Sequence, residues 1–224
     1  MSEPLASRDS VGRRCHLGRW TIAAEWRIGL DSPSADGAAS LSWSAHTTVT
    51  VSSVDDLRGL IREVPDFSKP GIRFYDITTL LKQPDAFREV IDRMAGQVGD
   101  TEVDLVVGME SRGFIFSAPL AYKLNAGFVP VRKLGKLPAE TIEVEYELEY
   151  GTATLEIHSD AIEKGQRVLI VDDLLATGGT VLGTIELVRR LGGEIAGLSF
   201  MVELTALKGR DHLDEFEIHT LLSY

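Results

Sequence analysis

The sequence predicts an α/β protein with a central, mainly parallel sheet flanked by helices. Short apolar runs bounded by turn residues alternate with longer segments whose apolar residues recur at helical spacing. This alternation is typical of strand–helix–strand units, which place parallel strands side by side. With 224 residues, 44% of them hydrophobic and 25% charged, the chain can bury a full core and has the composition of a globular protein.

Charge and cysteine content argue against several classes of protein. The net charge is −11 and there is no block of Lys or Arg, unlike in a general nucleic-acid binder. The single Cys15 rules out an internal disulfide and fits a reducing compartment. No apolar run approaches the roughly 18 residues that span a bilayer, and no secretory signal pattern opens the chain. We therefore expect a cytoplasmic protein that binds neither nucleic acid nor membrane.

The first 52 residues differ from the rest of the chain. They hold all three tryptophans and the only cysteine but no lysine, and their five acids balance five arginines. The stretch DSPSADGAASLSWSA (31–45) is small and polar without either period, which is typical of a disordered linker. We expect residues 1–52 to be an extension outside the fold, or the product of a start site assigned too early, and residues 53–224 to form the folded domain.

Four segments predict helices. SVDDLRGLIREV (53–64) combines a capping serine, acids in the first turn and apolar residues at helical spacing. PDAFREVIDRMAGQV (84–98) repeats this pattern with proline at the helix start. GFIFSAPLAYKLN (113–125) predicts a helix bent by its proline, and TVLGTIELVRRLGG (180–193) predicts one that ends at a glycine pair.

The strands are predicted by short apolar or alternating runs. TIEVEYELEY (141–150) alternates strictly, and Gly151 then turns the chain into TATLEI, which indicates a hairpin with one wet face. The other predicted strands are VDLVVG (103–108), GFVPV (127–131), RVLIVDD (167–173), IAGLSFMVEL (195–204) and EFEIHTLL (215–222).

The stretch VLIVDDLLATGGT (168–180) carries the strongest indication of function. A buried strand runs into two adjacent carboxylates, Asp172 and Asp173, and a loop of small residues follows before a helix. Backbone N–H groups at such a loop attract anions, and ligands of open α/β sheets bind at the carboxyl ends of strands. The alternative is a solvated strand end followed by an ordinary turn. Neither a Walker A motif nor a GxGxxG fingerprint is present.

This stretch looks like the 5-phosphoribosyl-1-pyrophosphate (PRPP) signature of the type I phosphoribosyltransferases. In that family the ligand PRPP needs both a site that binds its negative phosphate groups and carboxylates that face its ribose. Asp172 and Asp173 face the ribose, whose ring becomes oxocarbenium-like and positive in the transition state. The resemblance implies that the loop binds the 5′-phosphate through Ala176, Thr177, Gly178, Gly179 and Thr180.

Further segments extend the resemblance, in order, to the adenine phosphoribosyltransferases. They are PDFSKPGIRFYDITTLL, GMESRGFIF, VRKLGKLP and YELEYGTATLEI, and together the resemblance covers residues 53–224. It implies the type I phosphoribosyltransferase fold with a small hood at about 65–81 and a mobile β-hairpin loop at about 132–157. It also implies a homodimer that makes AMP and pyrophosphate from adenine and PRPP in purine salvage. Mg²⁺ would be held by PRPP and waters rather than by protein ligands.

The resemblance assigns pyrophosphate binding to the strand end at GMESRG and to the basic run VRKLGKLP. The residues are Ser111, Arg112, Arg132, Lys133 and Lys136, and the family often has a cis peptide bond at the position of Glu110–Ser111. Several cations suit a departing pyrophosphate, because arginine clamps phosphate oxygens in a bidentate way. Without the resemblance, Arg112 could form a surface ion pair and the basic run could be a solvated loop.

Adenine recognition is assigned to the hood. The resemblance implies main-chain hydrogen bonds at Arg73 and Tyr75 and stacking by Phe74, with the alternative that Phe74 is merely core. Paired hydrogen bonds would reject 6-oxopurines by leaving polar groups unpaired.

Glu149, in LEYG, is assigned by the resemblance as general acid/base at an imidazole nitrogen of the purine. Periodicity alone cannot choose between Glu149 and Glu147. Two other functions stay open: transfer to hypoxanthine, guanine or xanthine, and a regulator that binds PRPP. The acidic body and the intact LEYG loop argue against a regulator.

Overall fold

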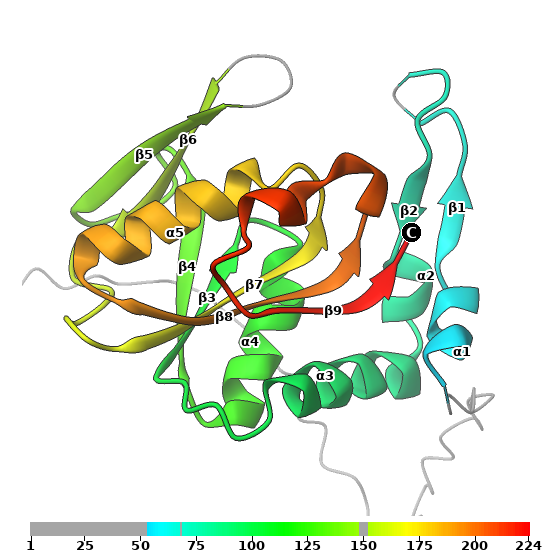
Figure 1. Cartoon of the computed structure of the whole chain (residues 1–224), viewed down its shortest axis with the longest axis horizontal. Helices are drawn as coiled ribbons and strands as arrows, with labels where there is room; N and C mark the ends of the chain where they lie inside the picture. Colours follow the sequence, from blue (N-terminus) through cyan, green and yellow to red (C-terminus); the bar gives the residue numbers. More distant parts are fainter. Residues whose placement is uncertain (1–52, 68, 148–151) are drawn as a thin grey trace, which may run out of the picture. The chain divides into compact units, whose positions relative to one another are not determined.

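The computed structural model describes residues 53–67, 69–147 and 152–224 (Figure 1). The chain divides into two units, Met1–Ser44 and Ala45–Tyr224, and every described residue belongs to the second. The expected extension, residues 1–52, lies outside the described residues. Within the described ranges, no helix is both long and apolar enough to cross a membrane.

The second unit contains a seven-stranded sheet in the order β5-β6-β4-β3-β7-β8-β9. At its centre β3 (Leu105–Met109) pairs in parallel with both β4 (Gly127–Lys133) and β7 (Arg167–Leu175). The parallel pairing continues through β8 (Glu194–Glu203) and β9 (Ile218–Ser223). The predicted mainly parallel sheet is therefore confirmed, because the buried apolar runs of the sequence form its central strands.

The antiparallel part of the sheet is the hairpin of β5 (Thr141–Glu147) and β6 (Thr152–His158). Strand β6 joins the edge of β4, where Lys133 lies opposite Leu155. Because β4 ends at Lys133, the first residues of β6 extend past the carboxyl end of the parallel strands. The hairpin therefore stands beside the edge at which ligands of such sheets bind.

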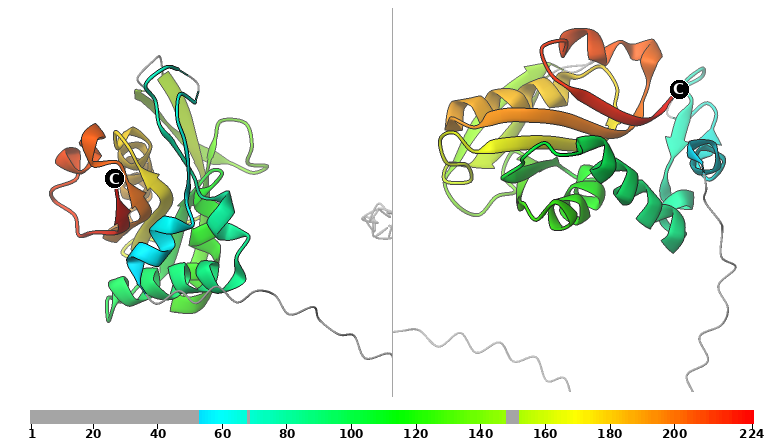
Figure 2. Two further views of the ribbon diagram at one scale, coloured as in Figure 1. Left: turned by 90° about the vertical axis from the view of Figure 1, so that its right-hand side faces the viewer. Right: turned by 60° about the horizontal axis from the view of Figure 1, so that its bottom comes forward.

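Helices cover both faces of the sheet (Figures 1 and 2). Helices α3 (Pro84–Val98) and α4 (Gly113–Leu124) pack on one face, and α5 (Gly179–Leu191) packs on the other. The alternation of β7 divides its side chains between these two cores: Leu169 and Val171 point to the first, and Val168 and Ile170 to the second. The predicted α/β architecture follows from this two-sided burial.

The helix predicted over 53–64 is wrong in its second half. Helix α1 (Val54–Gly59) begins with the predicted capping box at Ser53, but the chain then forms β1 (Arg62–Val64). Strand β1 pairs antiparallel with β2 (Phe74–Asp76), so its backbone groups find partners there. A helix this short is marginal by itself, and the proline after β1 disfavours a helical conformation just before it. The predicted hood, at about 65–81, begins just after β1 and contains β2.

Three short elements complete the second unit. Helix α2 (Thr78–Leu81) follows β2, and the 3₁₀ turns η1 (Thr205–Leu207) and η2 (Gly209–His212) lie between β8 and β9. In Figure 1 these turns lie beside the loop that joins β7 to α5. Sequence patterns predicted none of the three, because each is only about one turn long.

Candidate active site

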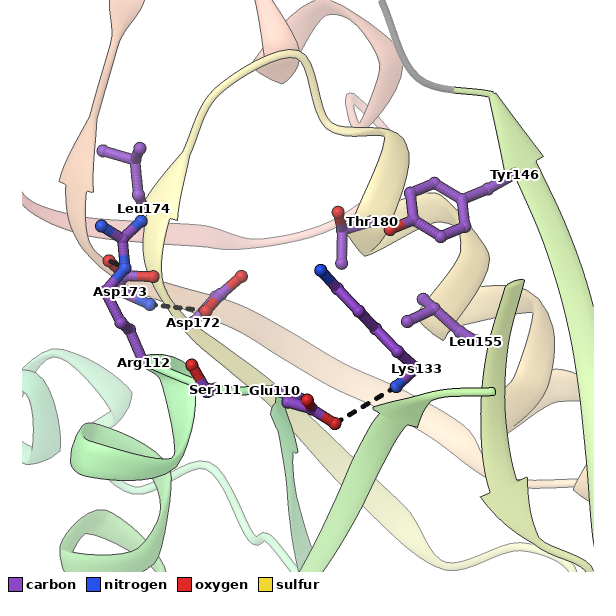
Figure 3. Close-up of a pocket in the computed structure, with 10 residues that line it drawn as sticks. All are labelled: Glu110, Ser111, Arg112, Lys133, Tyr146, Leu155, Asp172, Asp173, Leu174 and Thr180. Carbon is purple, nitrogen blue, oxygen red and sulfur yellow. Dashed lines mark hydrogen bonds and ion pairs between the residues drawn. The ribbon is translucent and has the colours of Figure 1, made fainter. Parts of the chain in front are cut away.

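A cavity of about 360 Å³ opens beside the carboxyl end of β7 and between the start of α4 and the β5–β6 hairpin (Figure 3). It gathers residues predicted from three separate motifs, namely Ser111, Arg112, Lys133, Asp172, Asp173 and Thr180. The other lining residues are Glu110, Tyr146, Leu155 and Leu174. Parallel pairing explains the convergence, because it brings the carboxyl ends of β3, β4 and β7 to one edge.

The two aspartates lie within β7, which continues to Leu175 rather than ending at them. Strand β3 pairs with β7 only as far as Gly108 opposite Val171. Both carboxylates therefore lie past the last paired position of the neighbouring strand, where the sheet leaves space for a ligand. Helix α4 approaches closely because it begins with Gly113, where a Cβ would lie 2.6 Å from Oδ1 of Asp172.

The two carboxyl groups of the acid pair are close together and poorly solvated. The Asp173 N–H donates to Oδ1 of Asp172 at 2.9 Å, and Oδ2 of Asp173 lies 2.8 Å from Nε of Arg112. Burial raises the pKa of Asp172 well above its ordinary range, and the neighbouring Asp173 charge raises it further. Burial also raises the pKa of Asp173, although Arg112 opposes this shift. Such a pair favours a ligand that brings positive charge to it.

The loop of small residues forms the start of α5. Gly178 precedes the helix with φ of 86°, a conformation that favours glycine, and the helix then runs for 13 residues. The first N–H groups of a helix have no partners inside it, which is the arrangement that attracts anions. Thr180 lines the cavity, whereas Ala176, Thr177, Gly178 and Gly179 are not among its lining residues, so the assignment of this loop to the 5′-phosphate remains a prediction.

Arg112 stands at the turn between β3 and α4. The peptide bond between Glu110 and Ser111 is cis, as the resemblance implied. The Arg112 guanidinium also lies over the ring of Phe74, with 5.6 Å between its central carbon and the ring centroid. The arginine therefore contacts the acid pair on one side and the hood on the other.

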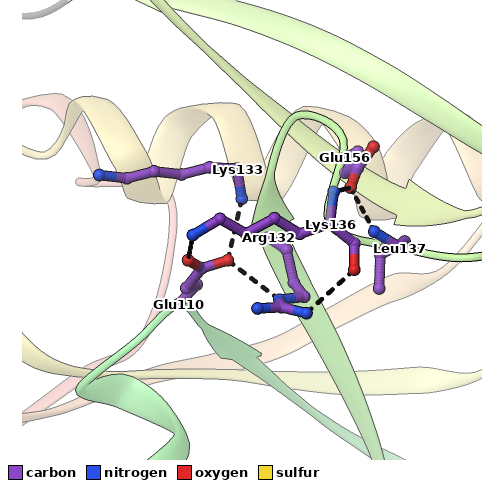
Figure 4. A network of polar contacts seen from close by, with 6 residues as sticks. All are labelled: Glu110, Arg132, Lys133, Lys136, Leu137 and Glu156. Atoms are coloured by element: carbon purple, nitrogen blue, oxygen red, sulfur yellow. Dashed lines mark hydrogen bonds and ion pairs between the residues drawn. The ribbon is translucent and has the colours of Figure 1, made fainter.

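Only part of the basic run lines the cavity, and its other cations join a network of polar contacts around Glu110 (Figure 4). Lys133 lines it, but Arg132 and Lys136 are ion-paired with Glu110, whose side chain is only 8% exposed. Burial raises the pKa of Glu110, but hydrogen bonds from Lys136, Arg132 and the Lys133 N–H outweigh it and lower that pKa. The assignment of Arg132 and Lys136 to pyrophosphate remains a prediction.

A second buried carboxylate holds the loop that carries these cations. Oε1 of Glu156 accepts hydrogen bonds from the N–H groups of Lys136 and Leu137, both at 2.7 Å. Glu156 belongs to β6 and is 3% exposed. Glu156 was not among the predicted site residues, because nothing in TATLEI marks its carboxylate as buried.

The hood encloses a second, smaller cavity of about 40 Å³. It is lined by the three predicted residues Arg73, Phe74 and Tyr75, together with Ile77, Arg112, Asp173, Leu174, Val202 and Leu204. Phe74 also contacts Phe67, with 4.7 Å between ring centroids. On the far side of the hood Tyr75 packs against Tyr224 at 4.0 Å. Arg112, Asp173 and Leu174 line both cavities, so the two spaces adjoin.

Several site residues were not identified from the sequence. Tyr146 lines the larger cavity, and Leu174, Val202 and Leu204 line the smaller one. All four are apolar or aromatic residues in strands or at a strand end, so their pattern matched that of core residues. The predicted general acid/base, Glu149, lies outside the described residues.

Comparison with known proteins identifies the family. A family model described as phosphoribosyl transferase domain matches residues 76–217. An adenine phosphoribosyltransferase of Acidobacterium capsulatum is 61% identical over 170 residues, which is 76% of this chain and 94% of the relative. The crystal structure of the enzyme from Thermoanaerobacter pseudethanolicus is 53% identical and superposes with a TM-score of 0.75, covering 77% of this chain and 100% of that one.

A structure from Saccharomyces cerevisiae connects the family to a ligand. That adenine phosphoribosyltransferase, 40% identical with a TM-score of 0.71, was crystallised with adenine and an imino-altritol bisphosphate, and the match covers 75% of this chain and 98% of that one. Three observations point to the same family: sequence identity over nearly the whole length of these relatives, the same fold, and the assembled cavity. The chain therefore belongs to the adenine phosphoribosyltransferases, the pentosyltransferases of purine salvage that transfer the phosphoribosyl group of PRPP to adenine and form AMP.

Proposed function

We propose that PRPP binds in the larger cavity with its ribose over Asp172 and Asp173, its 5′-phosphate on the loop 176–180 and its pyrophosphate beside Ser111 and Arg112. The observation that supports this placement is that the acid pair, Arg112 and Thr180 at the start of α5 line one cavity. As the bond from C1′ to pyrophosphate breaks, positive charge develops on the ribose ring. The desolvated carboxylates stabilise this charge more than they stabilise the neutral ring.

Arg112 would change partners during this reaction. Its guanidinium is bound to Asp173, but the side chain is 42% exposed and therefore has room to move. Pyrophosphate offers it a more highly charged partner, and Lys133 is a second cation in the same cavity. Arg132 and Lys136 join the site when pyrophosphate competes with Glu110 for them.

Adenine would bind in the space between Phe74 and Leu174. A volume of about 40 Å³ holds roughly three water molecules, which is less than a purine needs. Adenine can therefore enter only if Arg112 leaves the Phe74 ring or the hood moves outward. Main-chain groups of Arg73 and Tyr75 would then read the amino group and N1 of the base, in line with the adenine bound to the yeast relative.

Glu149 would serve as the general acid/base that assists attack by N9 of adenine. It follows Tyr146, a residue of the cavity wall, by three positions in the chain. Glu147, which ends β5, is the matched control because it lies in the same acidic run. Glu149→Ala should lower kcat by about 100-fold or more, while Glu147→Ala should change it little.

Mg²⁺ would act as the cofactor. Among the described residues no group of three or more His, Cys, Asp or Glu side chains is placed to hold a metal ion. The cavity does offer hard carboxylate oxygens at Asp172 and Asp173, which suit an ion that keeps most of its waters. We propose that Asp172 and Asp173 would hold Mg²⁺ through waters together with PRPP, and that the ion would supply positive charge that stabilises the departing pyrophosphate.

The active form would be a homodimer that contacts its copy through α4 and β4. Ile115 and Tyr122 lie seven residues apart on one face of α4 and are 37% and 90% exposed. Phe128 of β4, 39% exposed, packs edge-on against Phe114 of the same helix. Exposed apolar patches of this kind mark interaction sites. A dimer by sedimentation that Tyr122→Glu converts to monomer supports the proposal, whereas a monomeric wild type contradicts it.

The catalytic domain would comprise residues 53–224, with residues 1–52 as an extension outside it, in a cytoplasmic enzyme. The relative from Acidobacterium capsulatum supports this division, because 170 matched residues account for 94% of its length. The single cysteine supports a reducing compartment.

The decisive experiment offers adenine, hypoxanthine, guanine and xanthine separately with PRPP and Mg²⁺. Nucleotide formed from adenine alone supports the proposed hood and cavity together. Nucleotide from a 6-oxopurine contradicts the assignment of the hood. Tight PRPP binding without any nucleotide product would contradict catalysis and favour a sensor.

A further inference from the structure

The segment between β8 and β9 touches the loop that begins α5. Gly209 is buried, and a Cβ built on it would overlap the carbonyl oxygen of Ala176 and lie 3.0 Å from the backbone nitrogen of Gly178. In return, a Cβ on Gly178 would lie 3.1 Å from the carbonyl oxygen of Gly209. The two backbones are therefore in direct contact, with no room for a side chain between them.

Space, and not backbone conformation, requires glycine at this position. Gly178 has a left-handed φ of 86°, whereas Gly209 is not among the residues of positive φ. An alanine at 209 could adopt the observed backbone angles but would have to push the loop away. Packed interiors transmit such a displacement rather than absorb it.

The segment that carries Gly209 is itself firmly held. Arg210 binds Glu203 with two hydrogen bonds, Nε to Oε1 at 3.0 Å and Nη2 to Oε2 at 2.7 Å. Glu203 is the last residue of β8 and is 6% exposed. Leu204, which follows Glu203, donates its N–H to the carbonyl of Leu175 at the end of β7. The contact at Gly209 is thus anchored to the ends of two neighbouring strands.

We propose that Gly209 is a positioning residue for the 5′-phosphate of PRPP. Its backbone packs directly against Ala176 and Gly178 of the loop 176–180 and sets the position of the loop's N–H groups. The fork between Arg210 and Glu203 keeps this support in place. The inference rests on the proposed binding of the 5′-phosphate to this loop.

The test is Gly209→Ala in the full chain, with Gly197→Ala as the matched control. Gly197 lies in β8, and its Cβ would meet its nearest neighbour at an ordinary 3.5 Å. We expect Gly209→Ala to raise the KM for PRPP and the Kd for AMP at least tenfold, with the KM for adenine within twofold. Gly197→Ala should change none of the three by more than twofold.

Thr180→Ala separates failure of this inference from failure of the phosphate assignment. If Thr180→Ala raises the KM for PRPP but Gly209→Ala leaves it unchanged, the inference is overturned and the assignment stands. If neither variant changes the KM for PRPP, the inference about Gly209 and the assignment of the 5′-phosphate to this loop are both overturned. Equal rises in the KM of both substrates would mean general damage and would also overturn the inference. Should Gly209→Ala fail to fold, Arg210→Lys takes its place, because it weakens the two hydrogen bonds to Glu203. A rise in the KM for PRPP then supports the inference, and an unchanged KM overturns it.

Discussion

Replacing Phe74 by alanine should separate adenine binding from PRPP binding. Phe74 lies in β2 of the hood and lines the smaller cavity but not the larger one. Its ring is held between Phe67 at 4.7 Å and the Arg112 guanidinium at 5.6 Å. When Arg112 withdraws, the uncovered face of the ring becomes the surface on which a purine can stack.

The magnitude follows from the value of one stacking contact. Stacking between a base and an aromatic side chain contributes about 1–3 kcal/mol when measured by alanine substitution. Because about 1.4 kcal/mol is a factor of ten, the KM for adenine should rise about 5- to 150-fold. Phe74 does not line the cavity that we assign to PRPP, so the KM for PRPP should stay within about twofold.

Initial-rate kinetics with each substrate varied at saturation of the other measure both constants. Phe67→Ala is the matched control, because this ring contacts Phe74 without lining the cavity. It should raise the KM for adenine less than Phe74→Ala does. The reasoning is refuted if Phe74→Ala leaves the KM for adenine within twofold or raises both KM values equally.

Neutralising two carboxylates of the larger cavity, Asp172 and Glu110, should change the stability of the fold in opposite directions. Burial and Asp173 raise the folded-state pKa of Asp172, so its stabilising contribution is full below the unfolded pKa and is lost as pH rises through the folded value. Asp172→Asn should therefore raise Tm at pH 7 by about 2–4 °C per kcal/mol gained, and should not raise it in acid. The same substitution should lower kcat about 100-fold or more. Glu110 has a lowered pKa because hydrogen bonds from Lys136 and Arg132 outweigh burial, so its contribution is present above the unfolded pKa and lost as pH falls through the folded value. Glu110→Gln should destabilise the fold by about 1–3 kcal/mol at pH 7, because it removes the charge that pairs with two partly exposed cations, Arg132 and Lys136, and it should match wild type in acid. Thermal unfolding measured across pH checks both variants. A lower Tm for Asp172→Asn, or an unchanged Tm for Glu110→Gln, at pH 7 contradicts these predictions.

Local patterns in the sequence determined most of the elements of the fold. Helix α3 has the predicted bounds, because a proline at its start and a continuous apolar face act within one segment. The acid pair and the small-residue loop were also recognisable, since their chemistry depends on neighbours in the chain. The helix predicted over 53–64 failed after Gly59, because pairing of β1 with β2 outweighs local helical spacing.

Only the tertiary structure decided which of the predicted residues share a cavity. Arg132 and Lys133 are neighbours in the sequence, yet β4 sends Lys133 to the cavity and Arg132 to Glu110, because successive side chains of a strand point to opposite sides. Gly209 shows no local signal, since its requirement for glycine comes from the backbone of Ala176 and Gly178. The sequence by itself thus determined the chemical groups and the order of the longer strands and helices. Contacts between residues distant in the chain depend on how the layers pack, so only the assembled fold could decide them.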